Sequence, residues 1–207
     1  MTNRPQARGA RPFPWLPVIG GLIAIGLITI VVLTLDRGGD PGQFGQPVIA
    51  GTALPRFDDS PIDPAVGLAA PTVEGADFEG DPVSITNDGR PKIIIFLAHW
   101  CSHCQAEVPV VQQWVNDGLK PDGVDLYSVA TSTAETRPNF PPSRWLADEG
   151  WTAPVIADDT AFSAGDAFGL NAFPFWVFVD ADGTVAGRLT GELPPEAITQ
   201  LAESLTD

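Results

Sequence analysis

The sequence predicts an α/β protein with a mixed central sheet flanked by helices, preceded by one N-terminal transmembrane helix. Three observations predict this class. An uncharged apolar run lies near the N-terminus, short apolar strands alternate with helical segments in the rest of the chain, and a hairpin followed by a helix ends it. A length of 207 residues allows one domain and additional segments.

The N-terminal run, residues 12–35, contains no charged residue and is close to the roughly 20 residues that cross a bilayer as a helix. It has no polar face at helical spacing, which disfavours a soluble core helix. A cleaved signal peptide is the main alternative, but no small-residue cleavage site directly follows Leu35. Residues 1–11 contain three arginines and no acidic residue, so we expect a cytoplasmic N-terminus and an extracytoplasmic domain.

The remainder of the chain is strongly acidic. After residue 37 it contains 25 Asp and Glu residues against 7 Lys and Arg residues. This charge disfavours nucleic acid as a partner, because phosphate contacts require a basic face. A solvated surface that aids solubility is the interpretation we favour.

Residues 36–64 are rich in Gly, Pro and Asp and show no periodicity, so the sequence predicts a tether there and a globular domain over 65–207. The domain is expected to begin with a short hairpin over 77–85 that turns near Gly80.

A buried strand is predicted over 93–98, followed by a helix over 102–119. Apolar residues recur in this helix every three or four positions, and they are Cys104, Val108, Val111, Val115 and Leu119. The later elements are strands over 124–130 and 153–157, helices over 142–150 and 161–168, hairpin arms over 175–179 and 184–189, and a helix over 194–205.

The two cysteines, Cys101 and Cys104, are the only ones in the chain and lie at the start of the predicted helix. Their thiols fall on successive turns and close a ring too small to serve mainly as a structural link. Cys101 lies at the first turn, where unpaired N–H groups and the helix dipole favour a thiolate, whereas Cys104 faces the core. An oxidising compartment with a single cysteine pair therefore indicates a redox-active bond, with Cys101 attacking and Cys104 resolving.

Three neighbours are expected to tune this pair. Trp100 should shield one face of the site. His103, inside the ring, can stabilise a thiolate and so make the oxidised form a stronger oxidant. Glu107 follows Cys104 by one helical turn; if it is buried, desolvation raises its pKa and suits it to carry protons, and the alternative is a solvated carboxylate.

A metal-binding module is an alternative of another class. The two thiolates with His99 or His103 suit copper or zinc, but both histidines lie within the motif and no distant ligand completes a site. Covalent haem is excluded because Gln105, not histidine, follows the second cysteine. The sequence therefore predicts neither a metal nor another cofactor.

From about Gly67 to Leu205 the chain resembles the membrane-anchored, exported thioredoxin-fold thiol-disulfide oxidoreductases of the TlpA/ResA type. The features that carry the resemblance occur in a fixed order: the 67–71 entry, the Trp-Cys-Ser-His-Cys motif after a strand, Glu107 with Pro109, the 169–174 segment and the 180–183 turn.

The resemblance implies that Pro174 is a cis-proline facing the cysteine pair and that the backbone of Phe173 pairs with an extended segment of a protein substrate. An ordinary trans proline at the start of a strand is the alternative. The resemblance also implies protein thiol or disulfide substrates and a redox partner that recharges the pair.

The chain departs from the family at two positions. The family more often has a proline where His103 stands, and Ile95 occupies the place where many thioredoxins keep an acidic residue. The motif thus leans toward disulfide donation or isomerisation, as in DsbA-like proteins, while the fold and anchor resemble reductases that serve cytochrome c maturation. These two roles differ by about 150 mV in reduction potential, or about 7 kcal/mol.

Overall fold

The computed structural model describes residues 42–58 and 60–206, which belong to one compact unit. The predicted cytoplasmic segment 1–11 and the predicted span 12–35 lie outside the described residues. Within the described part of the chain, no helix combines the length and the apolar character that crossing a membrane requires.

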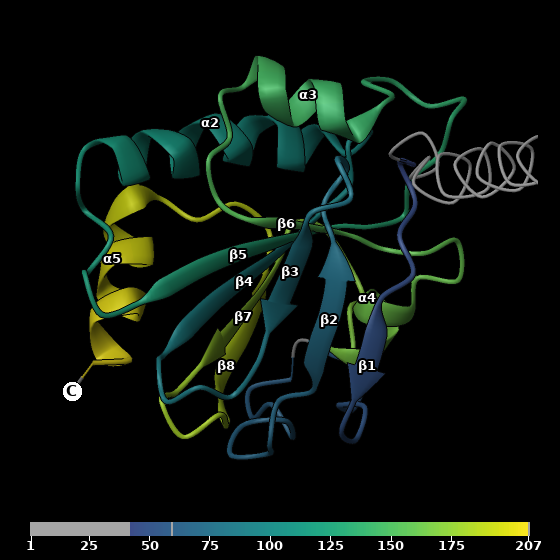
Figure 1. Ribbon diagram of the computed structural model, residues 1–207. Coiled ribbons are helices and arrows are strands. Elements are labelled where there is room, and N and C mark those ends of the chain that lie inside the picture. The colour runs from purple at the N-terminus through teal and green to yellow at the C-terminus, as the bar shows by residue number, and fades with distance from the viewer. Residues whose placement is uncertain (1–41, 59, 207) are drawn as a thin grey trace, which may run out of the picture. The chain divides into compact units, whose positions relative to one another are not determined.

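The unit contains two sheets (Figure 1). The larger has five strands in the order β6-β5-β4-β7-β8, where β4 (Lys92–Leu97), β5 (Asp125–Ala130) and β6 (Val155–Ala157) are parallel. The other two strands, β7 (Phe175–Val179) and β8 (Val185–Thr190), run antiparallel to their neighbours. This is the predicted mixed sheet. The smaller sheet is antiparallel and consists of β1 (Val48–Ala50), β2 (Thr72–Ala76) and β3 (Pro82–Ile85).

Side chains of the central strand β4 point alternately to the two faces of the large sheet. Other elements cover each face. On one face Ile93, Ile95 and Leu97 pack with α2 (Ser102–Asn116), α3 (Pro142–Asp148) and α5 (Pro195–Ser204). On the other, Ile94 and Phe96 pack with α4 (Ser163–Ala167) and the small sheet. The same division is visible in Figure 1. A strand buried on both faces is expected to be mostly apolar, and residues 93–97 of this strand are all apolar.

Residues 36–41 and 59 of the predicted tether lie outside the described residues, and the prediction is wrong for residues 42–58 and 60–64. β1 pairs with β2, and the Leu54 and Phe57 side chains are buried in the core beneath the small sheet. Asp63 also accepts two hydrogen bonds from the buried Arg188 guanidinium, at 2.6 and 2.9 Å. This Gly- and Pro-rich segment has no periodic pattern of its own. Widely spaced apolar residues and one ion pair therefore attach it to the domain.

Two boundaries also differ from the predictions. The helix α2 ends at Asn116, and Gly118 adopts a positive φ of 70°, so Leu119 does not continue the apolar stripe and is 45% exposed. The first arm of the early hairpin is β2, which ends before Asp77, although the turn near Gly80 is as predicted.

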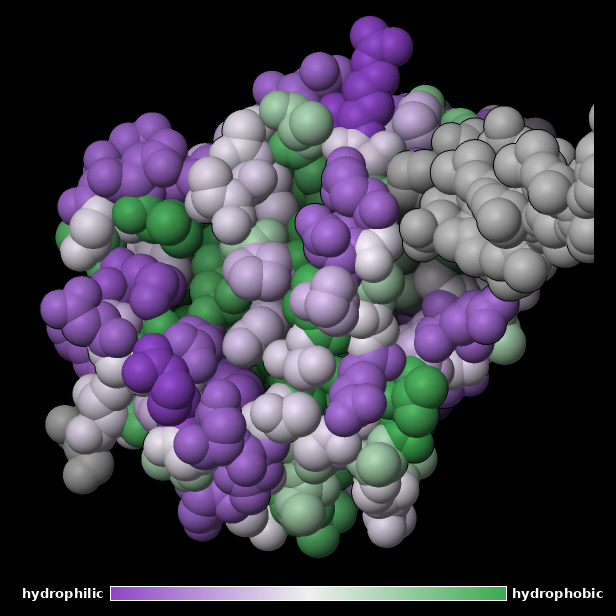
Figure 2. Space-filling view, in the orientation of Figure 1, coloured by the Kyte–Doolittle hydropathy of each residue, from purple (hydrophilic) through white to green (hydrophobic). Residues whose placement is uncertain are grey.

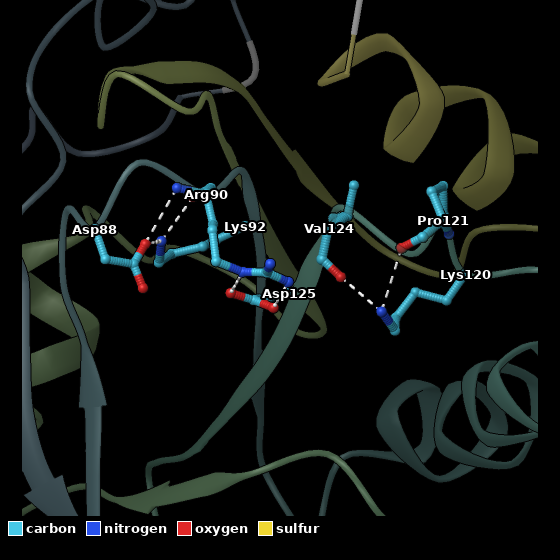
Figure 3. A network of polar contacts seen from close by, with 7 residues as sticks. All are labelled: Asp88, Arg90, Lys92, Lys120, Pro121, Val124 and Asp125. Atoms are coloured by element: carbon cyan, nitrogen blue, oxygen red, sulfur yellow. Dashed lines mark hydrogen bonds and ion pairs between the residues drawn. The ribbon is translucent and has the colours of Figure 1, made fainter.

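A polar network closes the end of the large sheet opposite the cysteine motif (Figure 3). Lys92, at the start of β4, is buried and forms an ion pair with Asp88 while donating to the Arg90 carbonyl at 2.7 Å. Arg90 in turn binds Asp125 through two hydrogen bonds of 2.6 and 2.8 Å.

On the face shown in Figure 2, hydrophilic residues surround smaller apolar patches, as expected for a solvated surface.

Candidate active site

The cysteine motif lies where β4 ends and α2 begins. Cys101 is the N-cap residue of the helix and is partly exposed, and Cys104, one turn later, is fully buried. Burial raises the pKa of the Cys104 thiol far above its usual value, although the Ala98 N–H donates to its sulfur at 3.5 Å. The predicted asymmetry is confirmed: one sulfur is accessible and the other is sheltered.

The segment before β7 faces the accessible sulfur. The Phe173–Pro174 peptide bond is cis, as the resemblance implied. The Cys101 Sγ lies 3.9 Å from the Phe173 carbonyl oxygen. The antiparallel pairing of β7 with β4 brings the two segments together, because β7 starts where β4 ends.

Trp100 is held in place beside Cys101 by contacts on three sides. Its indole Nε1–H donates to the Ser132 carbonyl at 2.7 Å. Its ring meets the Phe173 ring edge to face at 5.9 Å, and the Arg137 guanidinium lies 4.6 Å from its centroid. The indole thus forms a fixed wall next to the motif, as we expect of a residue that shields one face of the site.

Glu107 is buried, with 1% of its surface exposed, so the alternative of a solvated carboxylate is wrong. It accepts a hydrogen bond of 3.0 Å from the Leu193 N–H. Burial, with a smaller contribution from the negative charge of Glu192, raises the pKa of Glu107 to about 7. The carboxyl group can therefore gain or lose a proton near neutral pH.

His103 contacts Glu192, a residue that the sequence did not indicate as part of the site. Its Nδ1 lies 2.7 Å from the Glu192 carboxylate, and both side chains are largely exposed. Glu192 follows β8, 89 positions further along the chain, and no local pattern marks it.

Residues 191–193 connect the cis-proline segment with the motif helix. The Gly191 N–H donates to the Pro174 carbonyl at 2.9 Å, and the Trp176 indole donates to the Gly191 carbonyl at 3.1 Å. The next two residues contact α2 through His103 and Glu107. One short loop therefore holds the two halves of the site together.

His99, considered above as a metal ligand, has a structural role instead. It is 1% exposed, its Nδ1–H donates to the Pro138 carbonyl at 2.7 Å, and its Nε2 accepts the Ala134 N–H at 3.1 Å. Burial lowers the pKa of His99, and the Arg137 charge adds to this effect. Both ring nitrogens are occupied, so the neutral imidazole fixes the loop after β5 and is not available to a metal.

The chain matches the Redoxin family over residues 65–205.

The chain belongs to the Redoxin family.

Two relatives of this Redoxin-family chain are named for thiol-disulfide exchange. It is 26% identical over 199 residues to the thiol:disulfide interchange protein HelX of Rhodobacter capsulatus, covering 95% of this chain and 96% of the relative. It is 28% identical over 142 residues to the thiol-disulfide oxidoreductase ResA of Geobacillus thermodenitrificans, covering 68% and 78%. A solved thiol:disulfide interchange protein of Chlorobium tepidum superposes with a TM-score of 0.56 at 23% identity, covering 73% of this chain and all of that one.

These findings confirm the thioredoxin-like fold and the resemblance to the TlpA/ResA type. Together with the sulfur geometry, they establish this Redoxin-family chain as a thiol-disulfide oxidoreductase. Membership of this class implies protein thiol substrates and a redox partner.

Proposed function

We propose that the protein is an extracytoplasmic reductase of protein disulfides, of the TlpA/ResA type. A partner segment lies along the backbone of Phe173 beside the cis-proline. This position presents the disulfide of the partner to the partly exposed Cys101 sulfur. The apolar run 12–35 and the arginines before it support a membrane anchor with the domain outside. The pathway that the resemblance implies is cytochrome c maturation.

The exchange transfers two electrons to the partner. The Cys101 thiolate attacks one sulfur of the partner disulfide, that S–S bond breaks, and the other partner sulfur leaves as a thiolate. Cys104 then loses its proton and attacks the Cys101 sulfur, which releases the second partner thiolate and leaves the Cys101–Cys104 disulfide.

The second step requires a proton acceptor, because burial raises the pKa of Cys104. Glu107 lies three residues further along the helix, on the same face, and its pKa of about 7 suits it to accept this proton. In the reverse reaction, with which a redox partner reduces the pair again, Glu107 returns the proton to Cys104.

The contact between His103 and Glu192 is the observation that supports the proposed direction of electron transfer, from the cysteine pair to the partner. A protonated histidine between the cysteines would stabilise the thiolate and favour disulfide donation. Here the Glu192 carboxylate lies 2.7 Å from His103 and offsets such a charge, and Glu107 adds a second carboxyl group beside Cys104. Negative charges near the sulfurs destabilise thiolates, and this makes the reduced pair a stronger reductant.

The reduction potential of the pair tests this proposal. We expect a value near that of thioredoxin, about −270 mV, when the full chain in detergent is equilibrated with thiol buffers and its free thiols are trapped. We also expect His103→Ala to shift the potential by less than about 30 mV, because Glu192 offsets the histidine charge. A potential near −120 mV, together with a large fall on replacing His103, would instead support a disulfide donor of the DsbA type.

A further inference from the structure

Arg137 differs from most of the other basic side chains that the structure describes. Four of the others are paired with aspartates within 4.0 Å, namely Arg90, Lys92, Arg144 and Arg188. Lys120 donates to two backbone carbonyls. Arg137 is exposed, and among residues 42–58 and 60–206 no carboxylate lies within the ion-pair distance of its guanidinium.

This guanidinium lies at the edge of the active site. It rests over the ring of Trp100, the residue directly before Cys101, at 4.6 Å from the ring centroid. The indole is itself fixed by its hydrogen bond to Ser132 and its contact with Phe173. The charge is therefore held on the indole that directly precedes Cys101 in the chain and contacts Phe173, the residue on whose backbone we place the partner.

The loop that carries Arg137 is also fixed. The Arg137 N–H donates to the Ala134 carbonyl at 3.0 Å, and the buried His99 binds backbone groups on both sides of it, at Ala134 and Pro138. An exposed arginine on such a loop loses less conformational freedom on binding than one on a mobile segment, because its backbone and the indole beneath it are already ordered.

We propose that Arg137 is a specificity-determining residue that binds a carboxylate close to the reactive cysteine of the partner. A guanidinium presents paired N–H donors that match a carboxylate, and its stacked position leaves their edge free for a partner. The net charge of −15 repels acidic proteins in general, so a single cation beside Cys101 selects where an acidic segment approaches. This inference rests on the proposed exchange at Cys101 and names the chemistry of its partner.

The test uses three small disulfides that differ in charge: 3,3′-dithiodipropionate with two carboxylates, 2-hydroxyethyl disulfide with none, and cystamine with two ammonium groups. Each is mixed with the reduced full chain in detergent, and the rate constant for oxidation of the Cys101–Cys104 pair is measured. In every case the pair loses two electrons and the small disulfide becomes two thiols. The ratio of variant to wild-type rate for each compound cancels its intrinsic reactivity.

We expect Arg137→Gln to lower the rate constant for dithiodipropionate by about two- to fivefold, to leave that for hydroxyethyl disulfide unchanged, and not to lower that for cystamine. Arg137→Lys should keep most of the preference, and 0.5 M salt should remove most of it. Arg90→Gln is the matched control. It removes the same charge at the opposite end of β4 and should alter none of the three ratios.

Equal losses with all three compounds would overturn the inference, because Arg137 would then only support the Trp100 wall. Unchanged ratios in Arg137→Gln would overturn it as well. A reduced wild-type protein that reacts with none of the three disulfides would instead contradict the proposed function itself, so the two failures are distinguishable.

Discussion

Replacing Glu107 by glutamine should change how the stability of the folded protein depends on pH. The folded protein binds the Glu107 proton more tightly than the unfolded chain does, because burial raises the pKa of this group from 4.5 to about 7. Its contribution to stability is therefore fully present below pH 4.5 and is lost as the pH rises through 7. The difference of about 2.5 pH units corresponds to a free energy of unfolding of about 3 kcal/mol.

Glutamine is neutral at every pH, and its amide oxygen can still accept the Leu193 N–H. We expect the free energy of unfolding of Glu107→Gln, relative to wild type, to rise by about 2 to 3 kcal/mol between pH 4.5 and pH 8. Urea unfolding followed by tryptophan fluorescence measures it, with both proteins kept reduced. His99 has a lowered pKa and acts with the opposite sign, but it is present in both proteins and cancels.

Glu203→Gln, a change at an exposed glutamate on α5, controls for the loss of one negative charge. Its stability should follow the wild-type curve at each pH. If the curves of wild type and Glu107→Gln run parallel from pH 4.5 to 8, then the carboxyl group does not titrate as its burial requires. The proposed proton transfer between Cys104 and Glu107 would then lose its basis.

Two further outcomes follow from the same structure. Cys104→Ser should keep the attacking sulfur of Cys101 but remove the resolving one. Mixed disulfides with partner proteins should therefore accumulate, and non-reducing gels would detect them. Turnover like that of wild type would exclude the roles assigned to the two cysteines. Asp63→Asn should lower the free energy of unfolding by about 3 to 5 kcal/mol, because it leaves the Arg188 charge buried without its partner. Asp125→Asn, at the surface pair with Arg90, should lower it by less than about 1 kcal/mol. Equal effects of the two substitutions in urea unfolding would contradict the role of the buried pair.

The order of strands and helices could be predicted from the sequence because each depends on neighbours in the chain. The apolar run of β4 and the three-to-four spacing of α2 are local patterns, and the structure places both elements within a few residues of the prediction. The same spacing put Cys104 in the core. Its continuation to Leu119 failed because the chain turns at Gly118, after which the apolar residue faces solvent.

The contacts that complete the domain and the site connect residues far apart in the sequence, which no local pattern records. Arg188 binds Asp63 across 125 positions, and this pair draws the supposed tether into the fold. Glu192 reaches His103 across 89 positions from a loop with no motif. The burial of His99 likewise depends on a loop some 40 residues later, so the sequence suggested only a metal ligand.

The three residues 191–193 also determine where this protein can be altered. Hydrogen-bond geometry tolerates changes of only a few tenths of an ångström, and this loop forms such bonds with the cis-proline segment and with Glu107 at the same time. An insertion there would displace the platform for the partner and the proton carrier together. The turn between β2 and β3, where Glu79 is exposed, offers a safer place for a reporter group or an affinity tag.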